Sequence, residues 1–206
     1  MTKTATMTVN SHEGGMQEAL AMTEQLGIDA GLERRQKLHL RLLAEELFGM
    51  LRSIAGDVEA DYWLEYEGKG FEMHMRSDIK LTEEMRRQLI SASSSGENAA
   101  ARGFMGKLRV MIAEKLCANV GEGSLLSGLS VGMMGMASPT AQSAGAGSYQ
   151  WSMEQYKDEV KQHKDDSAAA SEAWDELEKS IVANIADDVR VWIVGTDVEI
   201  TVCKAF

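Results

Sequence analysis

A glycine-containing turn near the middle of the chain has the residue types of a phosphate-binding site. Residues 102–108 read Arg-Gly-Phe-Met-Gly-Lys-Leu, and a helical pattern begins around Gly103. Glycines that open a helix let backbone N–H groups and the positive end of the helix approach a phosphate. Arg102 or Lys107 would add a positive charge against it. The alternative is that Gly103 and Gly106 are ordinary loop and packing glycines.

The longest helical pattern, residues 32–54, would supply an acidic side chain. Glu46 and Met50 fall on the same shoulder of its apolar stripe, because positions four apart share a helix face, while Glu45 lies on the other side. Glu46 is either a functional carboxylate or a solvated helix residue. The stripe itself predicts a helix packed on a core, and consists of Leu40, Leu43, Ala44, Leu47, Phe48, Leu51 and Ile54.

Two stretches with period-two alternation predict β-hairpins. Residues 58–76 alternate on both sides of Gly68-Lys69-Gly70, and residues 189–202 alternate on both sides of Gly195-Thr196. The other elements predicted are a strand over 4–10, a helix that begins near 16, a charged helix over 82–90, and helices over 153–166 and 168–186. Strands in hairpins with helices grouped between them predict an α+β fold, a two-layer α/β sandwich with a mostly antiparallel or mixed sheet packed on one layer of helices.

This order of elements resembles the histidine-kinase-like ATPase superfamily, closest in style to the anti-sigma-factor serine kinases. The segment 44–50, Ala-Glu-Glu-Leu-Phe-Gly-Met, is similar to the family's first motif, a glutamate followed four residues later by an asparagine. The resemblance implies that Glu46 is the catalytic glutamate, which orients or activates the nucleophile. The asparagine that holds magnesium in the family is Met50 here, and a thioether cannot replace a hard oxygen ligand.

Two further motifs of the family have counterparts in the chain. Asp78 stands where the adenine-binding aspartate follows the hairpin, although Lys80 occupies the place of the first glycine in Asp-x-Gly-x-Gly. Asp78 has the alternative of capping the segment after the strand. The turn at 102–108 resembles the phosphate-binding motif, with residues 93–101 as the lid. The resemblance covers residues 4–116 and the last hairpin, and implies ATP or ADP as a ligand, bound weakly or not at all, without a well-held Mg²⁺.

Composition narrows the classes of partner. A net charge of -11 argues against nucleic acid, because an acidic surface repels phosphates. No leader segment and no apolar window long enough for a membrane span are visible, so a cytoplasmic protein is expected, with no membrane partner. Cys117 and Cys203 fit no metal-binding spacing and are predicted to be small core side chains. His39 and His74 show no carboxylate or cysteine pattern and are predicted to be structural.

The chain is predicted to be a single domain, 1–206, with an insertion at about 121–150 and an extra helix at about 152–166. Residues 121–148 are rich in Gly, Ser, Ala and Met, which is typical of a flexible insertion. Its apolar part, residues 125–137, has the alternative of docking on a partner, because methionine-rich surfaces adapt to varied shapes.

Three interpretations remain open from the sequence. The first is a degenerate ATP-binding regulatory domain, anti-sigma-factor-like, in which phosphoryl transfer would use Glu46 and is expected to be impaired without the metal ligand at Met50. The second is a non-catalytic protein-binding module that keeps the fold without nucleotide. Its acidic surface would suit a basic partner, sigma-factor-like or an antagonist by analogy. A structural domain without a small ligand is the third alternative.

Overall fold

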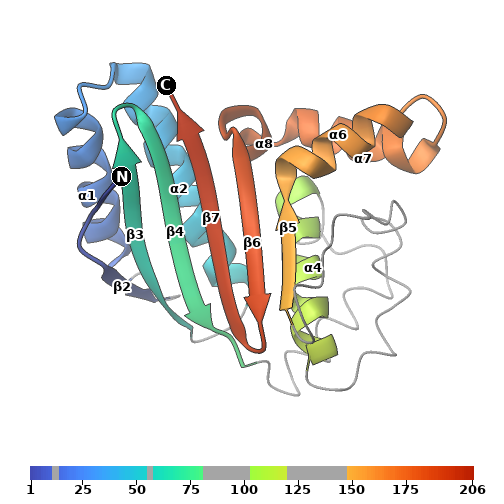
Figure 1. The fold of residues 1–206 in the computed structure, drawn as a ribbon, viewed down its shortest axis with the longest axis horizontal. Helices are drawn as coiled ribbons and strands as arrows, with labels where there is room; N and C mark the ends of the chain where they lie inside the picture. Colours follow the sequence, from blue (N-terminus) through green and yellow to red (C-terminus); the bar gives the residue numbers. More distant parts are fainter. Residues whose placement is uncertain (11–13, 55–57, 81–102, 120–147) are drawn as a thin grey trace.

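The computed structural model describes residues 1–10, 14–54, 58–80, 103–119 and 148–206. Its framework is a seven-stranded sheet in the order β1-β3-β4-β7-β6-β5, in which β2 also pairs with β3 (Figure 1). Every strand pairing is antiparallel. The strands are β1 (Thr2–Lys3), β2 (Met7–Asn10), β3 (Glu59–Glu67), β4 (Gly70–Asp78), β5 (Ser148–Ser152), β6 (Asp188–Val194) and β7 (Asp197–Ala205).

The helices leave one face of the sheet uncovered within the described chain. α1, α2 and α4 lie behind the sheet in Figure 1, and α6 and α7 lie beyond the end of β5. The bounds are α1 (Met16–Asp29), α2 (Arg34–Ile54), α4 (Gly103–Asn119), α6 (Met153–His163), α7 (Ala168–Lys179) and α8 (Ile181–Ile185). The predicted α+β two-layer sandwich is therefore confirmed. None of the described helices has both the length and the apolar character that a membrane crossing requires.

Alternating side chains separate the two faces of the sheet. On the helix side Val191, Ile200 and Met73 are each at most 1% exposed, whereas Arg190 and Trp192 on the opposite face are exposed. The stripe predicted on the long helix is buried against this side, including Leu40, Leu43, Leu47, Phe48 and Leu51. Burying such side chains contributes about 1.5–3 kcal/mol each, so this interface is the core of the fold.

A buried hydroxyl pair joins α1 to the sheet inside this core. The Oγ1 of Thr23 and the phenol oxygen of Tyr62 lie 2.8 Å apart, and both residues are 0% exposed. Thr23 also lies within hydrogen-bond distance of the Ala19 carbonyl, at 2.8 Å, so it donates to that carbonyl and accepts from Tyr62. The Phe48 ring meets Tyr62 edge-on, with centroids 4.9 Å apart. These contacts fix the position of α1 and α2 relative to β3.

Several predicted elements differ from the structure. The strand predicted over 4–10 is shorter in the structure, where only β2 (Met7–Asn10) falls in that range. β1 (Thr2–Lys3) precedes it, and both strands pair with β3. The helix predicted over 168–186 is broken at Ser180, whose backbone is extended (φ -82°, ψ 124°) and whose hydroxyl caps α8 by accepting from the Ala183 N–H. β5 was not predicted, and it overlaps the end of the predicted insertion at 121–150. The predicted helix at 82–90, the lid at 93–101 and residues 120–147 lie outside the described residues.

Candidate functional site

The long helix α2 places Met50 inside the core and Glu46 at its margin. Met50 is 4% exposed and belongs to the main hydrophobic cluster, whereas Glu46 is half-buried. A thioether among apolar side chains offers no ligand to a hard cation such as Mg²⁺. The position that the resemblance assigns to the metal ligand therefore serves packing.

Asp78 is an exposed carboxylate at the end of β4, held by the neighbouring hairpin turn. A hydrogen bond with Thr196 is the main cause that lowers the pKa of Asp78, and Lys80, 3.2 Å away, lowers it further. The Ile79 N–H also donates to the Thr196 carbonyl at 2.9 Å. These contacts fit the alternative in which Asp78 fastens the end of the strand.

A glycine opens α4, as the sequence predicts, but Lys107 near the start of this helix already forms an ion pair. Gly103 is the first residue of α4, with φ +77°, and no described atom lies within 4 Å of the place a Cβ would take. Gly106 lies within the first turns of α4, and Arg102 lies outside the described residues. Lys107 forms an ion pair with Glu176 of α7, with its ammonium 2.7 Å from the carboxylate. Lys107 is therefore not held ready for a phosphate.

The described geometry brings only part of the predicted site together. α2 and α4 contact each other behind the sheet, so the helices of Glu46 and Gly103 are neighbours. Asp78 instead lies opposite Asp197 of β7, and continuing across β6 this line of paired residues ends at Ser148, the first residue of β5. The ring of Phe104 packs near Trp151, three residues further along β5, with centroids 6.1 Å apart. Since a strand advances about 3.4 Å per residue, and β6 and β7 lie between β4 and β5, Asp78 and the glycine turn are well separated.

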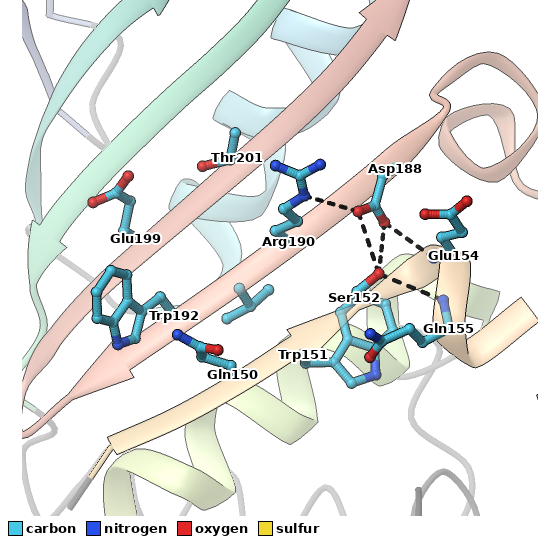
Figure 2. Close-up of a pocket in the computed structure, with 11 residues that line it drawn as sticks. Gln150, Trp151, Ser152, Glu154, Gln155, Asp188, Arg190, Trp192, Glu199 and Thr201 are labelled. Carbon is cyan, nitrogen blue, oxygen red and sulfur yellow. Dashed lines mark hydrogen bonds and ion pairs between the residues drawn. The ribbon is translucent and has the colours of Figure 1, made fainter. Parts of the chain in front are cut away.

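A polar hollow of about 490 Å³ lies over β5, β6 and β7 on the uncovered face (Figure 2). At one end Asp188, 5% exposed, accepts hydrogen bonds from the Ser152 hydroxyl at 3.0 Å, the Glu154 N–H at 3.0 Å and Nε of Arg190 at 3.0 Å. Its hydrogen bond is the main cause that raises the pKa of Arg190. Ser152 is also the N-cap of α6. A hydroxyl that donates to a carboxylate already held by two other donors is a helix cap and not an activated nucleophile.

A second hollow, about 650 Å³, lies between α1 and α2 and combines exposed apolar side chains with positive charge. Ile28 and Leu38 are 54% and 53% exposed there. Arg41 is bound by Glu24 and Glu45. The α1–α2 groove, as we call it, is lined by Glu24, Ile28, Arg34, Arg35, Lys37, Leu38 and Arg41. Sequence reasoning missed this groove because each of its residues is unremarkable on its own helix.

His74, predicted to be structural, has two carboxylate neighbours that the sequence prediction did not include. Its Nδ1 lies 3.2 Å from Glu199 and its Nε2 lies 3.7 Å from Glu72. The Glu72 contact had a signal in the sequence, because residues two apart on a strand share a face. The Glu199 contact had none, because it depends on the pairing of β4 with β7. The other predicted structural histidine, His39, is half-buried on α2.

Comparisons with known proteins add no relative. No protein-family model, curated protein or solved structure matched the chain. The likeness to histidine-kinase-like ATPases therefore rests on the motifs and the order of the elements alone.

Proposed function

We propose that this chain is a non-catalytic, protein-binding regulatory domain built on a scaffold like that of the histidine-kinase-like ATPases. The observation that carries this proposal is the α1–α2 groove, in which Ile28 and Leu38 are more than half exposed side by side with a group of cations. Exposed apolar side chains gathered in a hollow mark interaction sites more often than scattered ones do. The burial of Met50 and the engagement of Lys107 speak against nucleotide chemistry.

The positive charge of the α1–α2 groove indicates the charge of its partner. Arg34, Arg35 and Lys37 form no ion pair with any residue in the described part of the chain, whereas Arg41 is already neutralised by Glu24 and Glu45. A segment that buries its own apolar side chains here would place its flanks against three cations. The partner is therefore an amphipathic helix with an acidic border. The net charge of -11 favoured a basic partner, but the local charge of the groove has the opposite sign.

A fluorescence anisotropy titration tests this proposal. The probe is a labelled synthetic amphipathic helix with leucines on one face and glutamates beside them, and a second peptide carries lysines in place of the glutamates. We expect the acidic peptide to bind and the basic peptide to bind at least tenfold more weakly. Leu38→Ser should reduce affinity for the acidic peptide about tenfold, equivalent to about 1.4 kcal/mol.

Matched controls distinguish binding in the α1–α2 groove from non-specific hydrophobic binding elsewhere on the surface. Ile181→Ser removes an apolar side chain that is 51% exposed on α8 and does not line the groove, and should leave affinity unchanged. Equal binding of both peptides, or equal loss in Leu38→Ser and Ile181→Ser, would refute the proposal. Sedimentation of the chain alone is the second control. A dimer that Leu38→Ser dissociates would assign the groove to a second copy instead.

Residual nucleotide binding is the second candidate, favoured by one observation. Gly103 opens α4 with a left-handed backbone and open space around it among the described residues, as a backbone that approaches a phosphate requires. Thermal shift with ADP and ATP, each with and without Mg²⁺, decides it. A shift that does not depend on Mg²⁺ would support weak binding without a metal ligand. A shift only with Mg²⁺ would contradict our interpretation of Met50, and no shift would remove this candidate.

A further inference from the structure

His74 lies on the uncovered face of the sheet with one ring nitrogen bonded and the other unsatisfied. The residue is 9% exposed. Nδ1 lies 3.2 Å from the carboxylate of Glu199 and 3.1 Å from the hydroxyl of Thr201. Nε2 is buried and has no hydrogen-bond partner among the described residues, and it lies 3.7 Å from Oε2 of Glu72. A buried polar atom without a partner costs free energy, so this nitrogen requires an explanation.

A hydrogen bond from His74 to Glu199 selects one tautomer of the imidazole. An ionised carboxylate only accepts hydrogen bonds, so this bond requires the proton on Nδ1, whereas in the other tautomer Nδ1 accepts from the Thr201 hydroxyl. In the neutral imidazole with the proton on Nδ1, Nε2 has a free lone pair. Metal-bound histidines show this arrangement, in which a carboxylate holds one ring nitrogen and the metal takes the other.

Two acidic side chains lie on the open side of Nε2. Glu65 and Glu72 face each other across β3 and β4, and Glu72 is two residues from His74 on the same strand. One ligand atom from each of these three residues lies within 4.8 Å of the others. Tetrahedral ligands at about 2.0–2.1 Å from a zinc ion lie roughly 3.4 Å apart. Small rotations of the two carboxylates therefore suffice to bring the three atoms onto one ion.

Trp63 holds this cluster in place. Its indole stacks on the imidazole of His74, with ring centroids 4.8 Å apart and planes 2° apart. Its Nε1–H donates to Oε1 of Glu65 at 3.2 Å, which leaves the second oxygen of that carboxylate for other contacts. The ring orientation of His74 is thus fixed by Trp63 on its face and by Glu199 at its edge.

We infer that Glu65, Glu72 and His74 form a binding site for a divalent transition-metal ion, with Zn²⁺ as the best match. One imidazole and two carboxylates suit Zn²⁺ and leave a position for water, whereas Mg²⁺ and Ca²⁺ prefer oxygen ligands alone. Glu199 is a positioning residue that holds the tautomer. The local charge favours a cation, because the three carboxylates of Glu65, Glu72 and Glu199 outnumber the two nearby cations. These cations are Arg190, 3.6 Å from Glu72, and Lys3, whose ammonium lies 4.2 Å from the centroid of the Trp63 ring. This site is independent of the α1–α2 groove.

The rival account is a protonated His74 that bridges Glu72 and Glu199 with no metal. Titration of the full chain with Zn²⁺ at neutral pH, in competition with a chromophoric chelator, distinguishes the two accounts. We expect one Zn²⁺ per chain at this site. His74→Gln and Glu72→Gln should each weaken binding at least tenfold. Glu199→Gln should weaken it by about 10–100-fold, as loss of an outer-shell partner does.

His163→Gln is the matched control, since His163 is exposed on α6, away from this cluster, and its loss should leave Zn²⁺ affinity unchanged. Circular dichroism of each variant checks that the fold persists, and Glu72→Gln keeps the test valid if His74→Gln fails to fold. Absence of Zn²⁺ binding by the wild-type chain would overturn the proposal. Undiminished affinity in both His74→Gln and Glu72→Gln would overturn the proposal as well.

Discussion

The ammonium of Lys107 lies 2.7 Å from the carboxylate of Glu176, and this ion pair ties α4 to α7. The two side chains are 28% and 21% exposed, so the pair is shielded from solvent more than a surface pair is. The same lysine is one of the two cations, with Arg102, that the sequence predicts would face a phosphate at the glycine turn. Its geometry shows a structural role for Lys107 that sequence spacing does not reveal, because the partners are 69 positions apart.

Reversing the charge of Lys107 should destabilise the fold, and reversing both charges should restore it. Lys107→Glu places two carboxylates together in a partly buried position, and we expect a loss of about 1–3 kcal/mol in the free energy of unfolding. The Lys107→Glu, Glu176→Lys double variant should recover most of that loss. Urea denaturation measures all three proteins, with Lys161→Glu on the exposed side of α6 as the control. A double variant no more stable than Lys107→Glu would show that the pair contributes nothing.

Restoring an asparagine at position 50 should harm stability and not create a metal site. Met50 is 4% exposed in the core, so Met50→Asn buries an amide without designed partners at a cost of about 2–4 kcal/mol. Met50→Leu nearly conserves volume and should cost less than about 1.5 kcal/mol. Urea midpoints compare the two variants. Mg²⁺-dependent stabilisation of Met50→Asn by ATP, absent in Met50→Leu, would contradict our account of this position.

The elements that could be predicted are those encoded by local periodicity. The stripe from Leu40 to Leu51 and the alternation around Gly68 and Gly195 depend on neighbours a few residues apart, and they define α2 and both hairpins. β5 has only five residues and pairs with β6 about 40 positions later. The break at Ser180 was missed because the apolar pattern continues across it. A single extended residue whose hydroxyl starts a new helix leaves no mark on periodicity.

The parts of the site that could not be predicted depend on contacts distant in sequence. His74 acquires Glu199 because β4 pairs with β7, a relationship of register and not of spacing. The α1–α2 groove arises where two helices meet, so its charge and its apolar side chains belong to neither helix alone. Met50 was recognised as a departure from the motif, but its burial required the packing of α2 on the sheet.

The two substitutions that break the hydroxyl pair between Thr23 and Tyr62 should cost unequal amounts of stability. Thr23→Val leaves the buried phenol of Tyr62 without a partner and should cost about 1–3 kcal/mol. Tyr62→Phe removes that phenol, while Thr23 still donates to the Ala19 carbonyl, so the cost should be about 0.5–1.5 kcal/mol. Thr8→Val, at an exposed position, is the control and should change stability by less than about 0.5 kcal/mol. The order of the two losses, measured by urea denaturation, is the test. A larger loss in Tyr62→Phe would contradict this account, because phenylalanine keeps the ring and leaves no buried phenol without a partner.

Alkaline pH should destabilise the chain through its buried tyrosines. Burial is the main cause that raises the pKa of Tyr156 to about 12, and Glu176 and Glu159 raise it further. Burial also raises the pKa of Tyr62, against a smaller opposite effect of its hydrogen bond with Thr23. In the unfolded chain a tyrosine loses its proton near pH 10. Above that pH the folded state therefore binds more protons than the unfolded state, and stability falls as pH rises.

The stabilising contribution of Tyr156 is fully present below about pH 10 and is lost between about pH 10 and 12. Within this window the free energy of unfolding should fall by at most about 1.4 kcal/mol per pH unit for each buried tyrosine. Urea denaturation at successive pH values measures the slope for the wild-type chain and for Tyr156→Phe. The variant should lose stability less steeply over that window, while the lysines titrate alike in both proteins. Identical slopes would mean that the phenol of Tyr156 reaches solvent in the folded state.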